Sequence, residues 1–142
     1  MSEKKRNQTA PSTALRSDRV APIELLVVDD EVGFVNVIAK RMSKRNIKVT
    51  KAFSGSEAIK TLRRKDFGAA ILDLKMEDMD GIEVLKIMKK MVPEMPVIML
   101  TGHGSEQAAK EGIELGAFDY LTKPCELQDL VRKVHEAVTK RR

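Results

Sequence analysis

Five short apolar segments alternate along this chain with stretches of helical periodicity, beginning at Ile23. Between the first two segments, Phe34, Val37, Ile38 and Met42 recur at the spacing of a helix face. The apolar segments, which predict strands, are 23–28, 47–53, 69–72, 97–100 and 120–122. Five strand–helix units in a row predict an α/β fold, with a parallel sheet, helices on both faces and right-handed crossovers.

Local signals indicate where the helices begin and end. Ser54 and Glu57 form an S-x-x-E capping box, which predicts a helix start with Ala58, Ile59 and Leu62 facing inward. Ser105 is a candidate cap for the fourth helix, which we expect to end near Gly116. The third helix follows the loop 78–81 and runs to about Met91, and the apolar face of the fifth helix is formed by Leu127, Leu130, Val131, Val134 and Val138.

Polar residues follow four of the predicted strands directly. They are Asp29, Asp30, Asp73, Thr101 and Lys123. Ligands of open α/β sheets bind in the crevice at the carboxyl ends of the strands, so these side chains should converge. Three acids, a hydroxyl and an amine in one place could hold a divalent cation against a phosphoryl group.

Composition limits the other possibilities. The 142 residues are 42% hydrophobic and 33% charged, with 4% aromatic residues and no Trp, which fits one domain with an aliphatic, Met-rich core. No apolar segment approaches the roughly 20 residues of a membrane span, and no signal peptide is visible. The single cysteine, Cys125, excludes an internal disulfide and fits a cytoplasmic location.

The net charge of +5 is concentrated at the N-terminus. We expect residues 1–20 to be a disordered basic leader and residues 21–142 to be the folded domain. No second domain or output element is visible in the sequence. A regulator that acts on nucleic acid through this tail is one alternative function, although no folded DNA-binding element is present and nucleic acid is not the expected partner.

Four segments in the right order, each at a strand end, resemble the receiver domain of two-component response regulators, the CheY-like group. They are Leu26–Glu31, Ile71–Met76 with Asp80-Gly81, Val97–Gly102 and Gly116–Pro124. The resemblance spans about residues 23–140 and implies a flavodoxin-like (βα)5 fold with strand order 2-1-3-4-5. Two departures are visible, since Glu77 and Cys125 stand where the family often has Pro and Phe.

The resemblance implies a role for each strand-end residue. Asp73 would accept the phosphoryl group, and a carboxylate is a competent nucleophile for that reaction. Mg²⁺ would be bound by Asp30, Asp73 and the backbone carbonyl of Lys75, with Asp29 acting through water, because Mg²⁺ prefers hard oxygen ligands. Lys123 would pair with the phosphoryl oxygens. The resemblance also implies a cis bond between Lys123 and Pro124, which would aim the Lys123 amine into the crevice.

Thr101 and Tyr120 would form the conformational switch by the same resemblance. The Thr101 hydroxyl would bind the phosphoryl group and Tyr120 would turn inward, although a half-buried core aromatic is the alternative for Tyr120. His103 is expected to be a loop residue, His135 a surface residue and Cys125 an inert thiol. Arg63-Arg64-Lys65 is expected to be a solvated helix end.

The implied function is that of a single-domain response regulator in a two-component phosphorelay. Its phosphoryl donor would be a sensor histidine kinase or a phosphotransfer protein, and its output would be protein contact through the fourth helix, fifth strand and fifth helix. It would catalyse its own phosphorylation and slow hydrolysis, without turnover of a separate substrate. The sequence leaves three points open. It does not identify the downstream target, it does not decide between a monomer and a phosphorylation-dependent dimer, and it does not decide between a receiver fragment and a complete regulator. A flavodoxin-like electron carrier is the third alternative, disfavoured because acids stand where its phosphate-binding loop should be.

Overall fold

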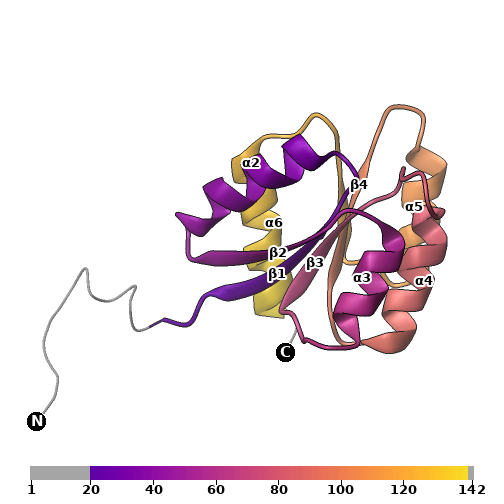
Figure 1. The fold of residues 1–142 in the computed structure, drawn as a ribbon. Coiled ribbons are helices and arrows are strands. Elements are labelled where there is room, and N and C mark those ends of the chain that lie inside the picture. Colours follow the sequence, from indigo (N-terminus) through magenta and orange to yellow (C-terminus); the bar gives the residue numbers. More distant parts are fainter. Residues whose placement is uncertain (1–19, 141–142) are drawn as a thin grey trace, which may run out of the picture.

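Five strands alternate with five helices in the computed structural model, which describes residues 20–140 (Figure 1). The strands are β1 (Ile23–Val28), β2 (Ile47–Ala52), β3 (Ala69–Asp73), β4 (Val97–Thr101) and β5 (Asp119–Thr122). The helices are α2 (Val32–Ser43), α3 (Gly55–Leu62), α4 (Gly81–Met91), α5 (Glu106–Glu114) and α6 (Leu127–Lys140). All five predicted strands and all five predicted helices are therefore confirmed, with boundaries shifted by a few residues at most.

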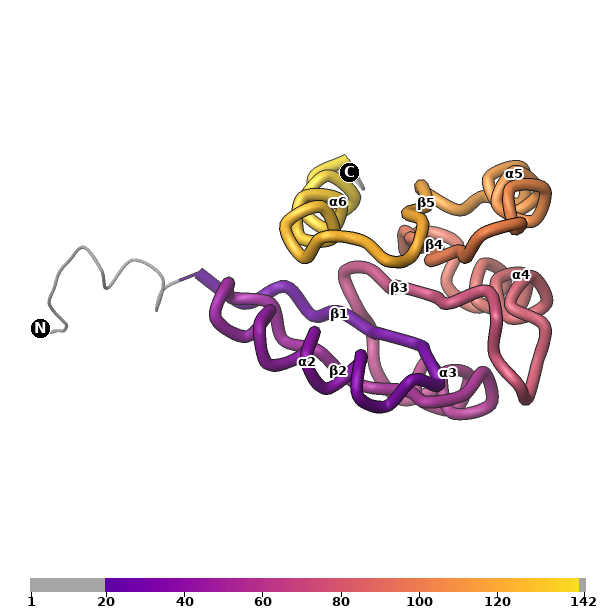
Figure 2. The backbone as a smooth tube through the Cα atoms, turned by 90° about the horizontal axis from the view of Figure 1, so that it is seen from above, coloured from indigo at the N-terminus to yellow at the C-terminus, as the bar shows by residue number. Residues whose placement is uncertain are grey.

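The sheet is fully parallel, with its strands in the order β2-β1-β3-β4-β5. This is the order that the family resemblance implied. Seen from above, α2 and α6 cover one face, and α3, α4 and α5 cover the other (Figure 2). The pairing places Val28 of β1 beside Leu72 of β3, and Leu72 beside Met99 of β4, so the carboxyl ends of the three central strands lie at one edge of the sheet.

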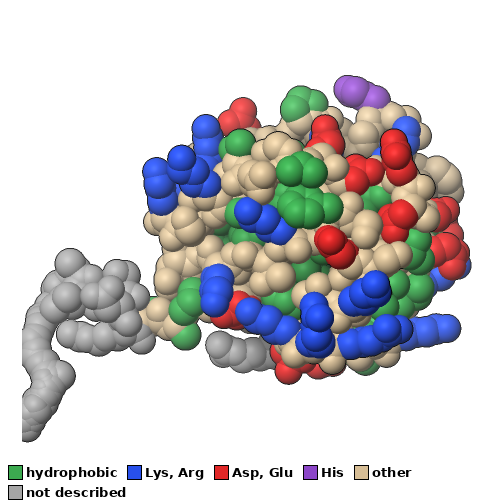
Figure 3. Space-filling model, viewed as in Figure 1, with side chains coloured by type: hydrophobic (Ala, Val, Ile, Leu, Met, Phe, Trp, Pro, Cys, Tyr) green, Lys and Arg blue, Asp and Glu red, His purple; other side chains and the backbone are tan. Residues whose placement is uncertain are grey.

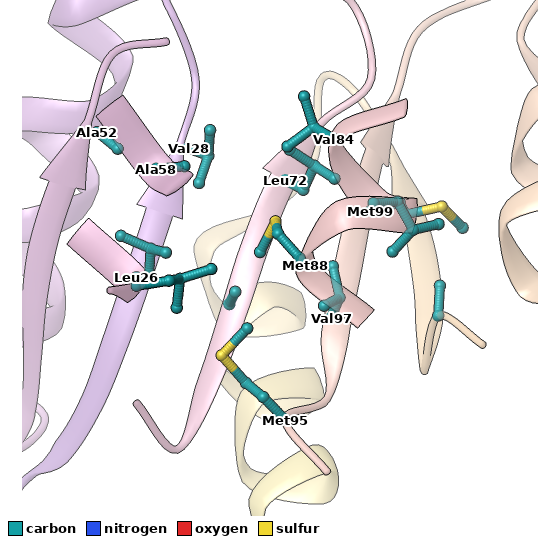
Figure 4. Packing of buried hydrophobic residues seen from close by; sticks show 14 of the residues in the cluster. Leu26, Val28, Ala52, Ala58, Leu72, Val84, Met88, Met95, Val97 and Met99 are labelled. Carbon is teal, nitrogen blue, oxygen red and sulfur yellow. The ribbon is translucent and has the colours of Figure 1, made fainter. Parts of the chain in front are cut away.

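Two hydrophobic clusters fill the space between the sheet and its helices. Leu26 and Val28 of β1 belong to the cluster under α3, α4 and α5, part of which is drawn in Figure 4. Leu25 and Val27 belong to the cluster under α2 and α6. Successive residues of a strand point to opposite faces, and a segment buried on both faces must therefore be apolar at every position, as Leu25–Val28 of β1 is. The predicted aliphatic, Met-rich core is confirmed, with Met42, Met88, Met95 and Met99 fully buried.

The start of α3 confirms the predicted capping box. The Ser54 hydroxyl accepts a hydrogen bond from the backbone N–H of Glu57 at 3.1 Å. The Glu57 carboxylate accepts in return from the N–H of Phe53 at 2.6 Å, one residue before the cap. At the other end of α3, Arg63, Arg64 and Lys65 are exposed, as expected of a solvated helix end.

Two details of the helix predictions were wrong. Val37 is 50% exposed, and Val35 is buried in its place beside Ile38 and Met42. Two residues correspond to about 200° around a helix, so the two valines point in opposite directions. Ser105 does precede α5, but its side chain makes no cap hydrogen bond, because its ψ of 19° departs from the extended conformation that aims a cap hydroxyl at the helix.

Charges are unevenly placed on the face seen in Figure 3. Lys and Arg side chains gather low in the view, over the lower ends of α3 and α4, and again at the upper left over α2, whereas most of the Asp and Glu side chains lie toward the upper right. None of the described helices is long and apolar enough to cross a membrane. The predicted basic leader, apart from Val20, lies outside the described residues and stays a prediction.

Candidate functional site at the carboxyl ends of the strands

Three strands end in buried polar residues at the same edge of the sheet. Asp29 follows β1 and is fully buried, Asp73 ends β3 with 5% of its surface exposed, and Thr101 ends β4 with 3% exposed. The Asp29 N–H still bonds the Ala52 carbonyl of β2 at 3.0 Å, so the sheet ladder holds the backbone of this residue rigidly. The predicted position of these three residues, at one edge of the sheet, is confirmed.

The carboxylates of Asp29, Asp30 and Asp73 form one cluster. A carboxylate oxygen from each lies within 4.8 Å of the others, close enough to bind one metal ion together. The pKa of Asp73 is raised to about 6, chiefly by burial and further by the nearby Asp29 carboxylate. The hydrogen bond that Asp73 accepts from the Lys75 N–H, at 3.1 Å, lowers this pKa and only partly offsets the rise. A group of like charges in a buried setting is destabilising unless a cation neutralises it.

Lys123 supplies a positive charge to this cluster. Its Nζ lies 2.9 Å from Asp29 Oδ2 and 3.8 Å from Asp73 Oδ2, and it also donates to Glu31. Burial alone would lower the pKa of Lys123, but the hydrogen bonds to Glu31 and Asp29 raise it to about 12. The amine is therefore a permanent cation. The Lys123-Pro124 peptide bond is cis, as the resemblance implied.

The loop between β3 and α4, residues 74–80, forms one wall of the site. Its backbone N–H groups face the acids: that of Lys75 donates to Asp73, and that of Glu77 donates to Asp30 at 3.1 Å. Gly81 permits the loop to close on itself, since a Cβ at that position would lie 2.4 Å from the Leu74 Cα. The loop thus reaches two of the three carboxylates directly.

The two predicted switch residues occupy different environments. Thr101 is buried, and its Oγ1 lies 3.5 Å from both the Leu121 carbonyl and the Thr122 hydroxyl, a distance at which hydrogen bonds are weak. Tyr120 of β5 is 41% exposed. Within residues 20–140, the Thr101 hydroxyl therefore has only these two weak partners, and Tyr120 is not packed into the core.

The other candidate residues are arranged as the sequence suggested. His103 is exposed in the loop after β4, and His135 is exposed on α6. Cys125 is half-buried against the α2–α6 cluster, and burial raises the pKa of its thiol, which disfavours the reactive thiolate.

Sequence reasoning missed two contacts of Lys123. Glu31 holds the Lys123 amine from the N-terminus of α2, and the Phe34 ring lies 4.7 Å from the same nitrogen. Glu31 directly follows the Asp29-Asp30 pair, and this run of three acids was the available signal. The ring and the carboxylate both favour the charged amine.

The arrangement can bind a hard divalent cation through carboxylate oxygens. It also places a nucleophilic carboxylate, Asp73, beside a fixed amine that can pair with an anionic substrate. The Thr101 hydroxyl and the backbone N–H groups of Lys75 and Glu77 add further polar groups at this edge of the sheet. This combination suits the transfer of a phosphoryl group, which depends on positioning and charge neutralisation more than on proton transfer.

Comparison with known protein families agrees with this chemistry. The sequence model of the response regulator receiver domain matches residues 25–135. A curated relative is the transcriptional regulatory protein GlrR of Escherichia coli K12, 36% identical over 117 residues. That alignment covers 82% of this chain and 26% of the relative, so the chain spans about a quarter of the length of the curated relatives it matches.

Solved structures match the fold over nearly all the described residues. The receiver domain of the Francisella response regulator 1452 has a TM-score of 0.78 and 31% identity, with coverage of 84% of this chain and 99% of that one. A CheY-like receiver domain protein from Methanospirillum hungatei has a TM-score of 0.81 and 27% identity, covering 85% and 97%. Nearly the whole of each of these two chains is matched.

Proposed function

The chain belongs to the response regulator receiver domain family of two-component signalling, and from this premise we propose that it accepts a phosphoryl group on Asp73. One observation supports the proposal above all. A buried carboxylate with a raised pKa lies within 4.8 Å of two further carboxylates and 3.8 Å from a permanent cation.

The donors of phosphoryl groups to this family are histidine kinases, and we propose a sensor histidine kinase or a phosphotransfer protein as the donor here. An oxygen of Asp73 forms the new bond to phosphorus as the bond between phosphorus and the donor breaks, which yields an aspartyl phosphate. Lys123 pairs with the phosphoryl oxygens after exchanging one of its present carboxylate partners for them. Its raised pKa keeps the amine protonated throughout this exchange.

We propose Mg²⁺ as the cofactor, held by Asp30, Asp73 and the Lys75 carbonyl, with Asp29 acting through water. The three acidic side chains are hard oxygen donors grouped closely enough for one small cation. The bound ion would neutralise charge on the carboxylates and the incoming phosphoryl group. The Glu77 N–H already orients Asp30, and the Lys75 N–H orients Asp73, so this chain's own loop arranges two of the ligands.

The output would be altered protein binding through the surface of α5, β5 and α6. Thr101 would donate its weakly held hydroxyl to the phosphoryl group, and the exposed Tyr120 would turn inward in response. Such a local change of charge alters the balance between two conformations of the β4–β5 edge. We also propose that the protein acts in the cytoplasm.

The test is phosphorylation by acetyl phosphate, followed by intact-protein mass spectrometry. We expect one added phosphoryl group that requires Mg²⁺ and is absent with chelator. Asp73→Asn removes the nucleophile and should abolish the mass increase, whereas His103→Asn, a matched exposed loop variant, should retain it. A phosphorylated Asp73→Asn protein would show that the acceptor is another residue.

A further inference from the structure

The 74–80 loop is fixed by two acidic side chains at its end. Asp80 caps α4 locally by accepting from the Ile82 N–H at 2.8 Å. Asp78 instead bonds a distant part of the chain. Its carboxylate accepts from the N–H groups of Gly55 and Ser56 at 3.0 and 3.1 Å and from the Ser56 hydroxyl at 3.1 Å. Those three donors lie in the first turn of α3, more than 20 residues earlier in sequence.

The first N–H groups of helix α3 have no acceptor within the helix, and they lie at the positive end of its dipole. Both properties favour a nearby carboxylate. The Ser54 hydroxyl takes the Glu57 N–H, and Asp78 takes the two N–H groups before it. The Gly55 N–H, with lesser help from Ser56, lowers the pKa of Asp78, so this carboxylate is ionised at neutral pH. The bonding of α3 to the loop is therefore complementary in both charge and geometry.

Close packing fixes the same contact sterically. A Cβ on Gly55 would lie 2.8 Å from Val84 Cγ2 of α4 and 3.0 Å from the Met79 sulfur. The start of α3 is thus pressed against the residue that follows Asp78 and against α4. Hydrogen bonding and packing together leave the 74–80 loop little freedom at this end.

The other side of the loop contacts the acid cluster. The Glu77 N–H, directly before Asp78, donates to Asp30 at 3.1 Å, and Lys75 pairs with Asp80 through an isolated bridge. Receiver domains often have proline in the place of Glu77, and proline has no N–H to donate. The hydrogen bond from the Glu77 N–H to Asp30 is therefore one that a proline at this position could not make.

We propose that Asp78 is a positioning residue for the metal site, which it serves by tying the 74–80 loop to the start of α3. It keeps the Glu77 N–H on Asp30 and the Lys75 N–H on Asp73. This inference rests on the proposed function, because it assumes that the acid cluster binds Mg²⁺. Asp78 itself contacts neither the metal nor the phosphoryl group. It acts through the loop.

The experiment is titration calorimetry of Mg²⁺ into the unphosphorylated full chain. Asp78→Ala should weaken Mg²⁺ binding about tenfold, the size expected when a residue that orients metal ligands is removed. Asp78→Asn keeps one oxygen acceptor and should fall between Asp78→Ala and the wild type. Ser54→Ala is the matched control, because it removes a hydrogen bond from the same helix start but leaves Asp78 in place, and its Mg²⁺ affinity should stay within twofold of the wild type.

Amide hydrogen exchange gives a readout that does not depend on metal. In chelator, the Glu77 amide of Asp78→Ala should exchange several-fold faster than in the wild type, and that of Ser54→Ala should not. If the wild type fails to bind Mg²⁺, the proposed function is at fault. If the wild type binds and Asp78→Ala binds within twofold of it, or if Ser54→Ala loses as much affinity as Asp78→Ala, the positioning role of Asp78 is wrong. Should Asp78→Ala not fold, the same criteria apply to Asp78→Asn.

Discussion

Leu72 and Asp73 are neighbours in β3 and are almost equally buried, at 0% and 5% exposure, yet they have opposite effects on the folded protein. Leu72 lies in the cluster under α3, α4 and α5, between Val28 and Met99 of the adjoining strands. Asp73 lies one residue further, among two other acids. Burial stabilises the first residue by removing apolar surface from water, and it raises the free energy of the second by removing a charge from water.

The same contrast separates the strand centres from the strand ends throughout the sheet. The centres of β1, β3 and β4 are apolar on both faces and need no partners beyond close packing. The ends place Asp29, Asp73 and Thr101 in equally buried positions, where each requires a hydrogen bond or an opposite charge. The close-packed strand centres thus fix the backbone of the strand ends. This rigid backbone keeps the acidic side chains close together despite their repulsion.

The largest expected effect is at the strand centre. Leu72→Ala should destabilise the protein by about 3 kcal/mol, because it removes a fully buried side chain and leaves a cavity between tightly packed strands. Urea unfolding followed by far-ultraviolet circular dichroism would measure the change. A loss below about 1 kcal/mol would mean that the neighbouring side chains collapse into the space, contrary to the rigid packing of this face.

The strand end should respond in the opposite direction. The pKa of Asp73 rises from its usual 3.8 to about 6 on folding, so the native state holds this proton more tightly than the unfolded state does. Protonated Asp73 contributes its full share to the unfolding free energy below pH 3.8, and this contribution is lost as the pH rises through about 6. In chelator at pH 7, Asp73→Asn should therefore be more stable than the wild type, by about 2 kcal/mol.

The pH dependence separates this cause from simple repacking. The stability difference between Asp73→Asn and the wild type should grow between pH 4 and 6 and stay constant above that range, with both proteins measured by urea unfolding in chelator. Added Mg²⁺ should reduce the difference, because it binds and stabilises the wild type. A difference that is constant from pH 4 to 7.5 would exclude the titration of Asp73 as its source.

The fold could be predicted from sequence because its signals are local and repeated. Strands buried on both faces must be apolar, as the segments 25–28, 69–72 and 97–100 are, and the two edge strands β2 and β5 are more polar. All five alternate with segments of helical periodicity. Which apolar residue of α2 faces the core was less certain, because Val35 and Val37 both fit a helical pattern and only the position of the sheet decides between them. The Ser105 cap was wrong for a related reason, since hydroxyl geometry depends on backbone angles that the residue type does not determine.

The central residues of the site were predictable because strand ends bring them to one edge of the sheet. The contacts that hold them were not. Asp78 bonds donors more than 20 residues away, and nothing in its own segment indicates α3 as its partner. Glu31 contacts Lys123 across 92 residues, and the choice of Glu31 over other nearby acids depends on how α2 leaves the sheet.

Glu31 provides the smallest expected effect and sharpens the contrast between buried and exposed charges. Both Glu31 and Asp29 bond the Lys123 amine, but the Glu31 side chain is 63% exposed and that of Asp29 is fully buried. Water and salt screen an exposed ion pair, and ordering two long side chains costs entropy. Glu31→Gln should therefore change the unfolding free energy by less than about 1 kcal/mol in chelator at pH 7.

The charge of Lys123 should survive this substitution. Loss of Glu31 lowers the pKa of Lys123 from about 12, but the Asp29 carboxylate at 2.9 Å still favours the protonated amine, so its ionisation at pH 7 is unchanged. Glu83→Gln, which breaks the exposed Glu83–Lys86 pair on α4, is the matched control and should have an equally small effect. A loss above 2 kcal/mol for Glu31→Gln alone would show that the amine depends on its exposed partner as much as on its buried one, and that exposure does not separate the two charges at this site.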